Sequence, residues 1–481
     1  MILILLILIP LLTGILTFAF KSGDGAKAMA LISSIATLGI SAYVSGANYT
    51  APVSFSCPWI PMLGTQFSLM ADGMSSMLCL LTGIVVMVVM ITNTNKEVEH
   101  PGSFYGLLLL SQAGLMGVFL AYDALVFYFF WELALIPVYF LCSKWGGEKR
   151  IPVTFKFFVY TFVGSLMMLS GLIYLSLQNP GLTSYSWPDI KAAGMALPAA
   201  TQQWLFWLLF IAFAIKMPIF PFHTWQPDTY EQAPTSVTII LSALMVKMGL
   251  FAVLRWLLPV VPVGVAFWSN TVIVLAIIGI VYASLIAIVQ TDLKRLVAYS
   301  SIAHMGLMCA AAFSNTNMGM HGIMVQMFNH GINITGMWLM VSMIENRWGT
   351  RDMTKLGGMA TVAPQMAIAL VIISLANIAL PLTNGFVGEF MLFNGIFESS
   401  SMYHITFMVV AGLGVILGAI YTLNMVQKAA YGNVTPMVIK KDLSANEYIG
   451  LAVIISLIIF LGVYPKPLLD LTSGVAGMLA K

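Results

Sequence analysis

Charged side chains are scarce in this sequence: they make up 8% of its 481 residues, whereas 60% of the residues are hydrophobic. A soluble domain carries roughly a quarter of its residues as Asp, Glu, Lys or Arg. A deficit this large indicates that most of the surface faces lipid rather than water. About 20 apolar residues span a bilayer, and such stretches recur from one end of the chain to the other. The composition therefore predicts an all-α polytopic membrane protein.

Cysteine is also rare. The four cysteines (Cys57, Cys79, Cys142 and Cys309) are scattered, and no two of them form a CxxC pair. Neither a haem site, an iron–sulfur site nor any other metal site is predicted from such spacing. Glycine-rich GxGxxG and Walker loops are absent, so the sequence does not predict a nucleotide site, and nothing in it predicts a nucleic-acid partner. If the protein takes part in redox chemistry, the cofactors would lie on other chains.

About fourteen spans are expected. The first 20 residues lack the basic region that opens a secretory signal peptide, so they are expected to be a retained first span. No soluble domain is predicted, and the longest polar stretches cover about 47–75, 178–203 and 428–447. The expected spans are centred near residues 11, 37, 84, 112, 132, 166, 212, 247, 276, 304, 331, 377, 416 and 456.

Basic residues are distributed unequally between the two sets of loops that fourteen spans define. Fifteen of the 21 Lys and Arg residues fall in loops that follow odd-numbered spans. Four fall in the loops on the other side: Lys191, Arg255, Lys466 and Lys481. The remaining two of the 21, Lys216 and Lys247, lie inside spans. Cytoplasmic loops are enriched in Lys and Arg. The asymmetry predicts a multi-pass protein of the bacterial inner membrane with both termini on the outer side.

Two of the expected spans are interrupted. Span seven contains KMPIFPFHTWQPD and span twelve contains LPLTNGFVGEF, with the helix-breaking residues Pro218, Pro221, Pro227, Pro381, Gly385 and Gly388. Proline removes a backbone donor and clashes with the preceding turn. Both stretches are therefore predicted to be broken helices. The alternative is that these residues reflect only the high frequency of proline and glycine in membrane helices.

The two interruptions suggest an internal repeat. Helices 4–8 (residues 101–260) and helices 9–13 (residues 261–432) would each have the broken helix as fourth member, flanked by helices 1–3 (residues 1–100) and helix 14 (residues 433–481). A repeat of five helices is odd, so its second copy must be inverted in the membrane. Paired broken helices in an inverted repeat mark the working site of many transporters.

Five ionisable residues fall inside the apolar spans: Glu132, Lys216, Lys247, His304 and Glu389. A charge at a helix centre costs roughly 2.5–3.5 kcal/mol on insertion scales, so such residues predict function. Glu389 is expected near the N-terminus of the second half of span twelve, where the helix dipole favours a carboxylate.

Other ionisable residues in or near the spans are weaker candidates. His330 is a further candidate, although a neutral histidine can simply be hydrogen-bonded. An intramembrane Glu–Lys pair can likewise be a static clasp between helices. Four residues lie near breaks or helix ends and rank lower: Asp72, Asp123, His223 and Asp228.

Taken together, the five residues fit a proton path. Burial disfavours the charged form of lysine, so a lysine beside a movable carboxylate can exchange protons near neutral pH. A chain of such sites linked by water would carry protons, and moving the carboxylate would couple a distant event to proton transfer. These residue types do not distinguish proton from sodium as the transported ion.

Five stretches resemble a known family over about residues 70–430: DALVFYFFWELALIPVYFL, AIKMPIFPFHTWQPDTYEQAPTSV, TDLKRLVAYSSIAHMG, MFNHGINITGMWL and LPLTNGFVGEF. They are similar to the antiporter-like subunits of respiratory complex I, which resemble subunits of Mrp-type sodium/proton antiporters and membrane-bound hydrogenases. A glutamate at position 389, where related subunits carry lysine, is typical of the M type. The sequence departs from the family at Tyr230, where histidine is usual, at Gln232, where an acid is usual, and at Leu382, where glycine is usual.

The resemblance implies a proton-translocating subunit with fourteen helices and two inverted repeats. It implies that Glu132 pairs with Lys216, that Lys247 is the connecting lysine, and that Glu389 is the exit-side residue. His304 and His330 would lie on the axis between them. NADH, FMN, iron–sulfur clusters and quinone would be bound by partner subunits, and the neighbours would be lipids and L- and N-type subunits. The alternatives are an Mrp or hydrogenase subunit and a passive membrane scaffold.

Overall fold

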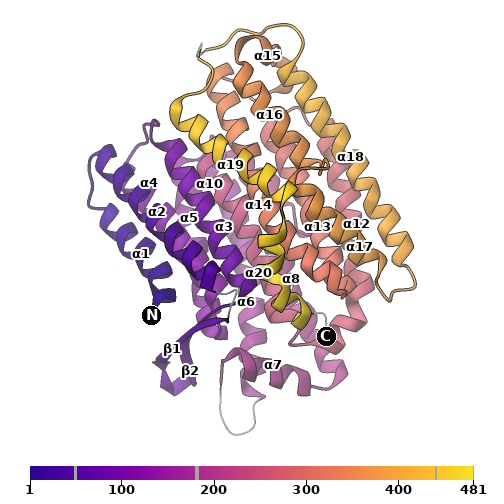
Figure 1. Ribbon diagram of the computed structural model, residues 1–481. Coiled ribbons are helices and arrows are strands. Elements are labelled where there is room, and N and C mark those ends of the chain that lie inside the picture. Colours follow the sequence, from indigo (N-terminus) through magenta and orange to yellow (C-terminus); the bar gives the residue numbers. More distant parts are fainter. Residues whose placement is uncertain (48–50, 179–183, 439–440, 480–481) are drawn as a thin grey trace.

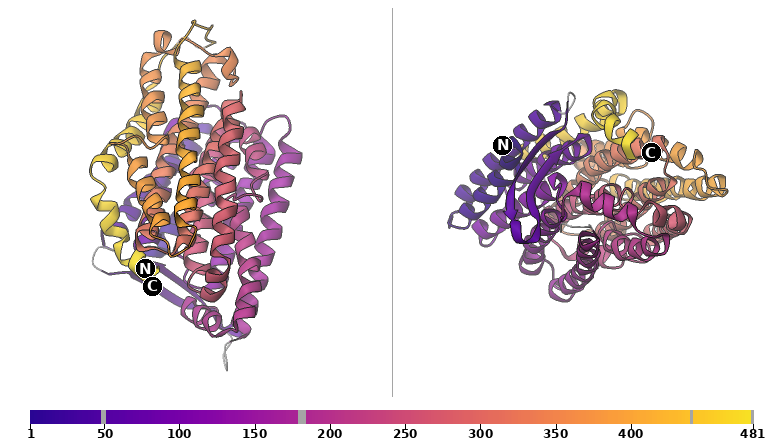
Figure 2. Two further views of the ribbon diagram at one scale, coloured as in Figure 1. Left: turned by 90° about the vertical axis from the view of Figure 1, so that its right-hand side faces the viewer. Right: turned by 90° about the horizontal axis from the view of Figure 1, so that it is seen from below.

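The computed structural model describes residues 1–47, 51–178, 184–438 and 441–479. Lys440 and Lys481, which contributed to the charge asymmetry, lie outside these ranges. The helices run side by side, with the N-terminal pair at one flank and the helix of residues 404–430 at the other (Figure 1). Both termini lie at the same end of the bundle (Figure 2).

The helices follow the predicted order closely. The N-terminal part contains α1 (Ile2–Thr17), α2 (Gly23–Ala47) and α3 (Gly73–Asn93). Residues 101–260 form α4 (Pro101–Leu120), α5 (Ala124–Trp145), α6 (Arg150–Leu177), α7 (Trp187–Ala196), α8 (Ala199–Lys216), α9 (Trp225–Gln232), α10 (Thr235–Ile240), η2 (Leu241–Met245), α11 (Val246–Ala252) and η3 (Val253–Leu257). Residues 261–432 form α12 (Pro262–Val289), α13 (Leu293–Ser314), α14 (Asn317–Trp348), η4 (Met353–Lys355), α15 (Met359–Val362), α16 (Pro364–Asn377), α17 (Asn384–Phe397) and α18 (His404–Ala430). The chain continues with α19 (Ala445–Val463) and α20 (Lys466–Leu479).

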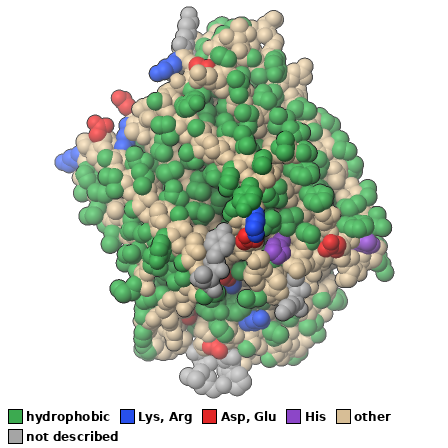
Figure 3. Space-filling model, viewed as in Figure 1, with side chains coloured by type: hydrophobic (Ala, Val, Ile, Leu, Met, Phe, Trp, Pro, Cys, Tyr) green, Lys and Arg blue, Asp and Glu red, His purple; other side chains and the backbone are tan. Residues whose placement is uncertain are grey.

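Eleven helices of the described chain are long and apolar enough to cross a membrane, and α1 and α16 are shorter apolar helices. Every one of the predicted span centres lies in a helix. The count of fourteen crossings stays a prediction, because α14 does not meet the same criterion of apolarity. Hydrophobic side chains cover much of the face in Figure 3, and the charged side chains on it are scattered.

A small sheet departs from the purely helical expectation. Strands β1 (Val53–Ile60) and β2 (Thr65–Ala71) form an antiparallel hairpin around η1 (Pro61–Leu63), within the stretch expected to be a polar loop. Side chains of β1 alternate between half-buried and exposed over most of its length, as a strand covered on one face requires. The hairpin lies at the end of the bundle that holds both termini (Figure 2).

Acidic side chains begin several of the helices. The carboxylate of Asp123 accepts hydrogen bonds from the amides of Leu125 and Val126 at the start of α5. Asp292 accepts one from the amide of Arg295 at the start of α13. Such caps satisfy amides that have no partner within the helix. The ranking of Asp123 as a helix-end residue therefore agrees with the structure.

Both predicted breaks are present. The first separates α8, which ends at Lys216, from α9, which begins at Trp225. The second separates α16 from α17, between Asn377 and Asn384. In both regions the broken helix is the fourth long helix after the start of the predicted repeat, as expected. Each break interrupts the bundle close to candidate residues and exposes backbone groups there.

The helix at the centre of the bundle is irregular. Residues 235–257 run continuously through α10, η2, α11 and η3, and residues 236–257 are all buried. Both η2 and η3 are π-helical. Arg255 lies in η3 rather than in a loop, where the sequence placed it, and it forms a buried ion pair with Asp72 at the start of α3. This pairing explains how a cation is accommodated inside the helix.

Candidate functional site

The innermost contact of the site joins the two predicted repeats. Lys247 on α11 is completely buried, and its Nζ lies 2.7 Å from Nδ1 of His330 on α14. The Lys247 ammonium also donates to the Ser242 carbonyl at 3.0 Å. Ser242 belongs to the π-helical turn η2. Such turns are frequent at functional sites and leave backbone groups available to side chains.

From His330 the polar contacts continue towards the second broken helix. The rings of His330 and His304 are 5.4 Å apart between centroids, and His304 lies on α13. Nδ1 of His304 lies 3.0 Å from Oε1 of Glu389 on α17. Four of the predicted residues, Lys247, His330, His304 and Glu389, are therefore brought together in one row. The row passes from the first repeat to the far broken helix through side chains alone.

Glu389 is held by side chains rather than by the helix dipole. It is the sixth residue of α17, which begins at Asn384. The dipole acts within the first turn of a helix, so the expected dipole support was wrong. The carboxylate instead contacts His304 and the Gln326 amide, whose Nε2 lies 3.5 Å from Oε1.

Glu132 and Lys216 lie near each other but do not touch. Lys216 is 2% exposed at the end of α8, and its Nζ lies 5.6 Å from the ring centroid of Trp131. Glu132 follows Trp131 on α5 and interacts with the Ser165 hydroxyl of α6. No ion pair joins Glu132 to Lys216 within the described chain, although their charges interact at longer range. The pairing implied by the resemblance is therefore not a direct contact here, because the ammonium faces the Trp131 ring instead.

A small cavity adjoins Glu389 and His304. Its volume is about 30 Å³, which is room for one or two water molecules. Asn377 and Tyr421 also line it. Both donate to the Ser300 hydroxyl oxygen, Asn377 at 3.2 Å and Tyr421 at 3.0 Å. This cluster joins the end of α16 to α13 and α18 beside the acid–histidine pair.

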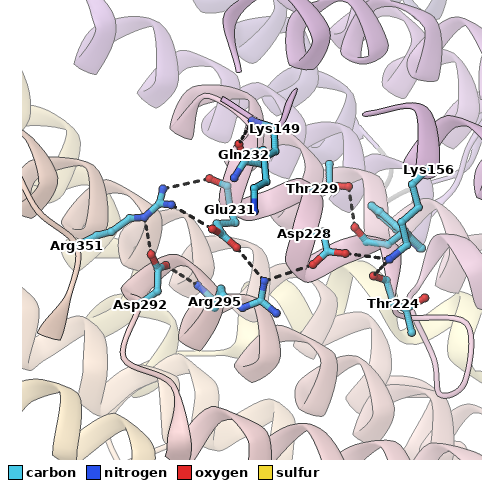
Figure 4. Close-up of polar contacts among 11 residues, drawn as sticks. Lys149, Lys156, Thr224, Asp228, Thr229, Glu231, Gln232, Asp292, Arg295 and Arg351 are labelled. Carbon is cyan, nitrogen blue, oxygen red and sulfur yellow. Dashed lines mark hydrogen bonds and ion pairs between the residues drawn. The ribbon is translucent and has the colours of Figure 1, made fainter. Parts of the chain in front are cut away.

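An ionic network holds α9 at the bundle surface (Figure 4). Arg295 of α13 contacts Glu231 at 2.8 Å and Asp228 at 3.3 Å, both on α9. Asp228 also binds Lys156 of α6 at 2.9 Å. Arg351 completes the network through Glu231 at 3.4 Å. The second half of the first broken helix is thus tied to both repeats, and Asp228 has a structural role, as its low rank suggested.

Two departures from the family pattern, Tyr230 and Gln232, lie in α9. Gln232 accepts hydrogen bonds from the backbone amides of Gly147 and Lys149 through its carbonyl and its side chain. Tyr230 is completely buried against Trp225 and Trp338. His223 is buried in the break with its ring against Phe220. These contacts give Tyr230 and Gln232 packing roles in this chain.

Sequence reasoning missed a row of amides on α14. Gln326, Asn329 and Asn333 flank His330 within MVQMFNHGIN, at spacings that place all four on one face of a helix. Asn329 donates to the Asn384 carbonyl at 2.7 Å, and Asn333 donates to the Ala376 carbonyl at 3.2 Å. The helical spacing of polar residues in a buried helix was the available signal. These amides were not predicted, because only ionisable residues were taken as candidates.

Comparison with known proteins identifies relatives of this chain. The family described as NADH:quinone oxidoreductase/Mrp antiporter, TM, matches residues 121–418. The chain is 35% identical over 479 residues to F(420)H(2) dehydrogenase subunit M of Methanosarcina mazei, covering 97% of this chain and 95% of that one. It is 35% identical over 448 residues to NADH-quinone oxidoreductase subunit M of Rickettsia typhi, covering 92% and 89%.

Solved structures show the same fold. A chain of respiratory complex I from Thermus thermophilus with bound NADH is 28% identical, with a TM-score of 0.90 over 100% of both chains. A chain of the Mrp complex from Dietzia is 22% identical with a TM-score of 0.86, covering 98% of this chain and 52% of that one, and this likeness concerns the fold alone. The chain therefore belongs to the family of membrane subunits shared by NADH:quinone oxidoreductases and Mrp antiporters.

Proposed function

We propose that this chain is the M-type, proton-translocating subunit in the membrane arm of an NADH:quinone oxidoreductase. The observation that carries the proposal is the row Lys247–His330–His304–Glu389, in which the outer pairs are in polar contact and the two histidine rings lie 5.4 Å apart between centroids. Charges are costly in lipid, and a merely structural role does not require a lysine, two histidines and a glutamate to lie along one line. The family to which the chain belongs includes subunits of NADH:quinone oxidoreductases, and the row would act in such a complex.

The row suits proton transfer in its chemistry. Lys247 can donate to the Nδ1 lone pair of His330, and His304 can pass a proton to the Glu389 carboxylate. Imidazole nitrogens can take up and release protons near neutral pH. Lys216 and Glu132 form the approach from α8 and α5, where the ammonium is free to change partner. A change in the distance between Glu132 and Lys216 would then bias the protonation of the row.

The remaining parts of the machine would lie on other chains. NADH, FMN, iron–sulfur clusters and quinone would be held by partner subunits, since this chain has few cysteines and no nucleotide motif. Antiporter-like subunits of the L and N types would be its neighbours in the membrane arm. We place the chain in the bacterial inner membrane with both termini outside, a proposal supported by the excess of basic residues in the opposite loops.

A second candidate differs only in the electron donor. The chain is as similar to a subunit of F(420)H(2) dehydrogenase as to subunit M of NADH-quinone oxidoreductase. Oxidation assays of the purified complex with each donor would separate the two. An Mrp-type antiporter would instead be isolated without redox subunits. Repeating the transport assay with and without sodium would test the proton as the transported ion.

Site variants test the function itself. Glu132→Ala and Lys216→Ala should abolish coupled proton pumping by the reconstituted complex, while native gels still show full assembly. Lys355→Ala, an exposed lysine in η4 away from the row, is the matched control and should pump normally. Normal pumping by both site variants would overturn the proposal. A passive scaffold predicts that apolar replacements at Lys247 or Glu389 are tolerated, because each removes a buried charge.

A further inference from the structure

The second break leaves backbone groups without helical partners. The last carbonyls of a helix and the first amides of the next have no partner within their own helix. In water such groups are solvated, but inside a membrane protein they must be satisfied by other parts of the protein or by trapped water. At the α16–α17 break the helix ends Asn377 and Asn384 are buried near Glu389, whereas Leu380 and Leu382 between them are exposed. The groups that hydrogen-bond to the backbone on the two sides of the break also determine where the second half of the helix lies.

Two side-chain amides of α14 meet the two edges of this break. Asn333 donates to the carbonyl of Ala376, the next-to-last residue of α16. Asn329 donates to the carbonyl of Asn384, the first residue of α17. A carbonyl at the start of a helix also has a partner within the helix, so this bond is an additional tie between α14 and α17. Only the NH₂ of an asparagine can donate to a carbonyl, so these contacts fix the orientation of both amides. The donors are four residues apart, or about 6 Å along one straight helix.

Close packing prevents other arrangements at this contact. A Cβ atom on Gly385 would lie 2.3 Å from the Ala376 carbonyl oxygen, and one on Gly388 would lie 3.0 Å from the Cα of Gln326. A side chain at position 385 would force α17 away from the end of α16, and one at position 388 would force it away from α14. The glycines thus let the amides reach backbone that ordinary residues would cover.

The same row continues to the acid. Gln326, one turn before Asn329 and His330, points its Nε2 at Glu389 from 3.5 Å. Asn329, Asn333 and His330 are all at most 3% exposed. The helix that carries His330 therefore also holds both edges of the break and contacts the carboxylate beyond it. The positions of His330 and Glu389 are linked through one rigid element.

We propose that Asn329 and Asn333 are positioning residues, whose amides bridge the α16–α17 break and so set Glu389 against His304. The inference rests on the proposed function for the meaning of that contact, but the geometry itself can be measured separately. The first break is held differently: the Trp225 indole donates to the Ile215 carbonyl at 2.9 Å, one residue before Lys216. Each break thus has its own side-chain donor beside a residue of the predicted path.

The decisive variant is Asn333→Asp in the assembled complex, because it keeps the shape of the side chain. An ionised carboxylate repels the Ala376 carbonyl, whereas a protonated one donates to it through its O–H. Coupled pumping should fall about tenfold at about pH 8.5 and recover towards the wild-type rate at about pH 6, where a buried aspartate is protonated. Each value is divided by that of the wild type at the same pH, so that other pH-dependent steps of pumping cancel.

Two further variants separate positioning from packing. Asn333→Leu should lose pumping about tenfold at every pH, and its structure in the complex should show Glu389 out of hydrogen-bond reach of His304. Asn317→Leu, at the exposed first residue of the same helix, is the matched control and should behave as wild type. An unchanged Glu389–His304 distance in Asn333→Leu, or a pH profile of Asn333→Asp parallel to wild type, would overturn the positioning role.

Failure of the positioning role can be told apart from failure of the proposed function. If Glu389→Ala stops pumping while both Asn333 variants pump normally, only the positioning role is wrong. If Glu132→Ala and Lys216→Ala pump normally, the proposed function is wrong. The contact between Glu389 and His304 can still be compared between wild type and Asn333→Leu by structure determination.

Discussion

Nζ of Lys247 lies 2.7 Å from Nδ1 of His330, so a lysine of the first predicted repeat and a histidine of the second share one hydrogen-bonded contact. Each is fully or almost fully buried. A proton on Lys247 therefore has a basic nitrogen within reach inside the membrane. No rearrangement of the helices is needed for that transfer. This contact makes the interface between repeats, rather than either repeat alone, the centre of the proposed path.

His330→Leu should interrupt the path at this interface. The variant leaves Lys247 with only the Ser242 carbonyl, which cannot accept a proton for onward transfer. We expect the number of protons pumped per electron to fall by more than about tenfold, with assembly retained. The measurement is pumping against donor oxidation in proteoliposomes. His321→Leu, on the same helix but away from the row, is the control, and equal losses in the two variants would argue against the path.

Charge removal on α9 tests the surface network. Asp228→Asn combined with Glu231→Gln removes the ion pairs with Lys156, Arg295 and Arg351. Exposed pairs contribute roughly 0.2–1 kcal/mol each, so the complex should stay folded while α9 opens more often. Hydrogen exchange of residues 225–232 should accelerate in the double variant.

Salt provides the internal control for that experiment. Ion pairs at a surface weaken as the Debye length falls below about 10 Å. High salt should therefore speed the exchange of residues 225–232 in the wild type and have little effect on the double variant. If salt accelerates both equally, the network does not hold α9.

Lys96 predicts a pH dependence of stability. It lies between α3 and α4, and its Nζ donates to the Ser342 hydroxyl at 3.0 Å. Burial lowers the pKa of Lys96 from its ordinary value of 10.5, and Glu447 and Glu345 partly oppose this shift. Between the lowered pKa and 10.5 the unfolded chain holds more protons than the folded chain, so this residue makes stability rise with pH.

The Lys96→Met variant should lack this rise of stability with pH. Its thermal midpoint should exceed that of the wild type most at pH values below the lowered pKa, and the difference should shrink as pH rises towards 10.5. Thermal unfolding of the purified complex at a series of pH values measures the difference. A difference that is constant with pH would show that Lys96 keeps its charge in the fold.

Much of the architecture could be predicted because it depends on local properties. Lys247 and Glu389 stand out as lone charges in apolar stretches, and Pro218 and Pro381 mark the breaks. The contacts between Lys247 and His330 could not be predicted, because they depend on how α11 and α14 pack across 83 residues of sequence. The contact between Lys216 and the indole of Trp131 could likewise not be predicted. The expected partner of Lys216 was Glu132, which follows Trp131 in the sequence.

The hairpin and the row of amides on α14 were not predicted from the sequence, for different reasons. Residues 53–71 have weak alternation that a polar loop could share, and their pairing is set by contact with the bundle end. Asn329 and Asn333 act on backbone carbonyls, which carry no sequence signature. Their targets, the carbonyls of Ala376 and Asn384, lie on the two sides of the break. A search for polar residues at helical spacing in a buried helix would have identified the donors but not their function.

Gly114→Ala tests whether the packing behind Glu132 is at its limit. A Cβ atom at position 114 of α4 would lie 2.5 Å from the backbone nitrogen of Ala134, two residues after Glu132 on α5. Because backbone cannot move as a side-chain end does, we expect overpacking to cost about 1–3 kcal/mol and to shift α5. Gly412→Ala on α18, where a Cβ would meet no atom within 4 Å, is the matched control. In that helix alanine should be neutral or stabilising by up to about 1 kcal/mol. Thermal unfolding compares the two variants, and proton pumping then shows whether moving α5 disturbs Glu132. If Gly114→Ala is as stable as Gly412→Ala and pumps normally, the contact between α4 and α5 does not fix the position of the acid.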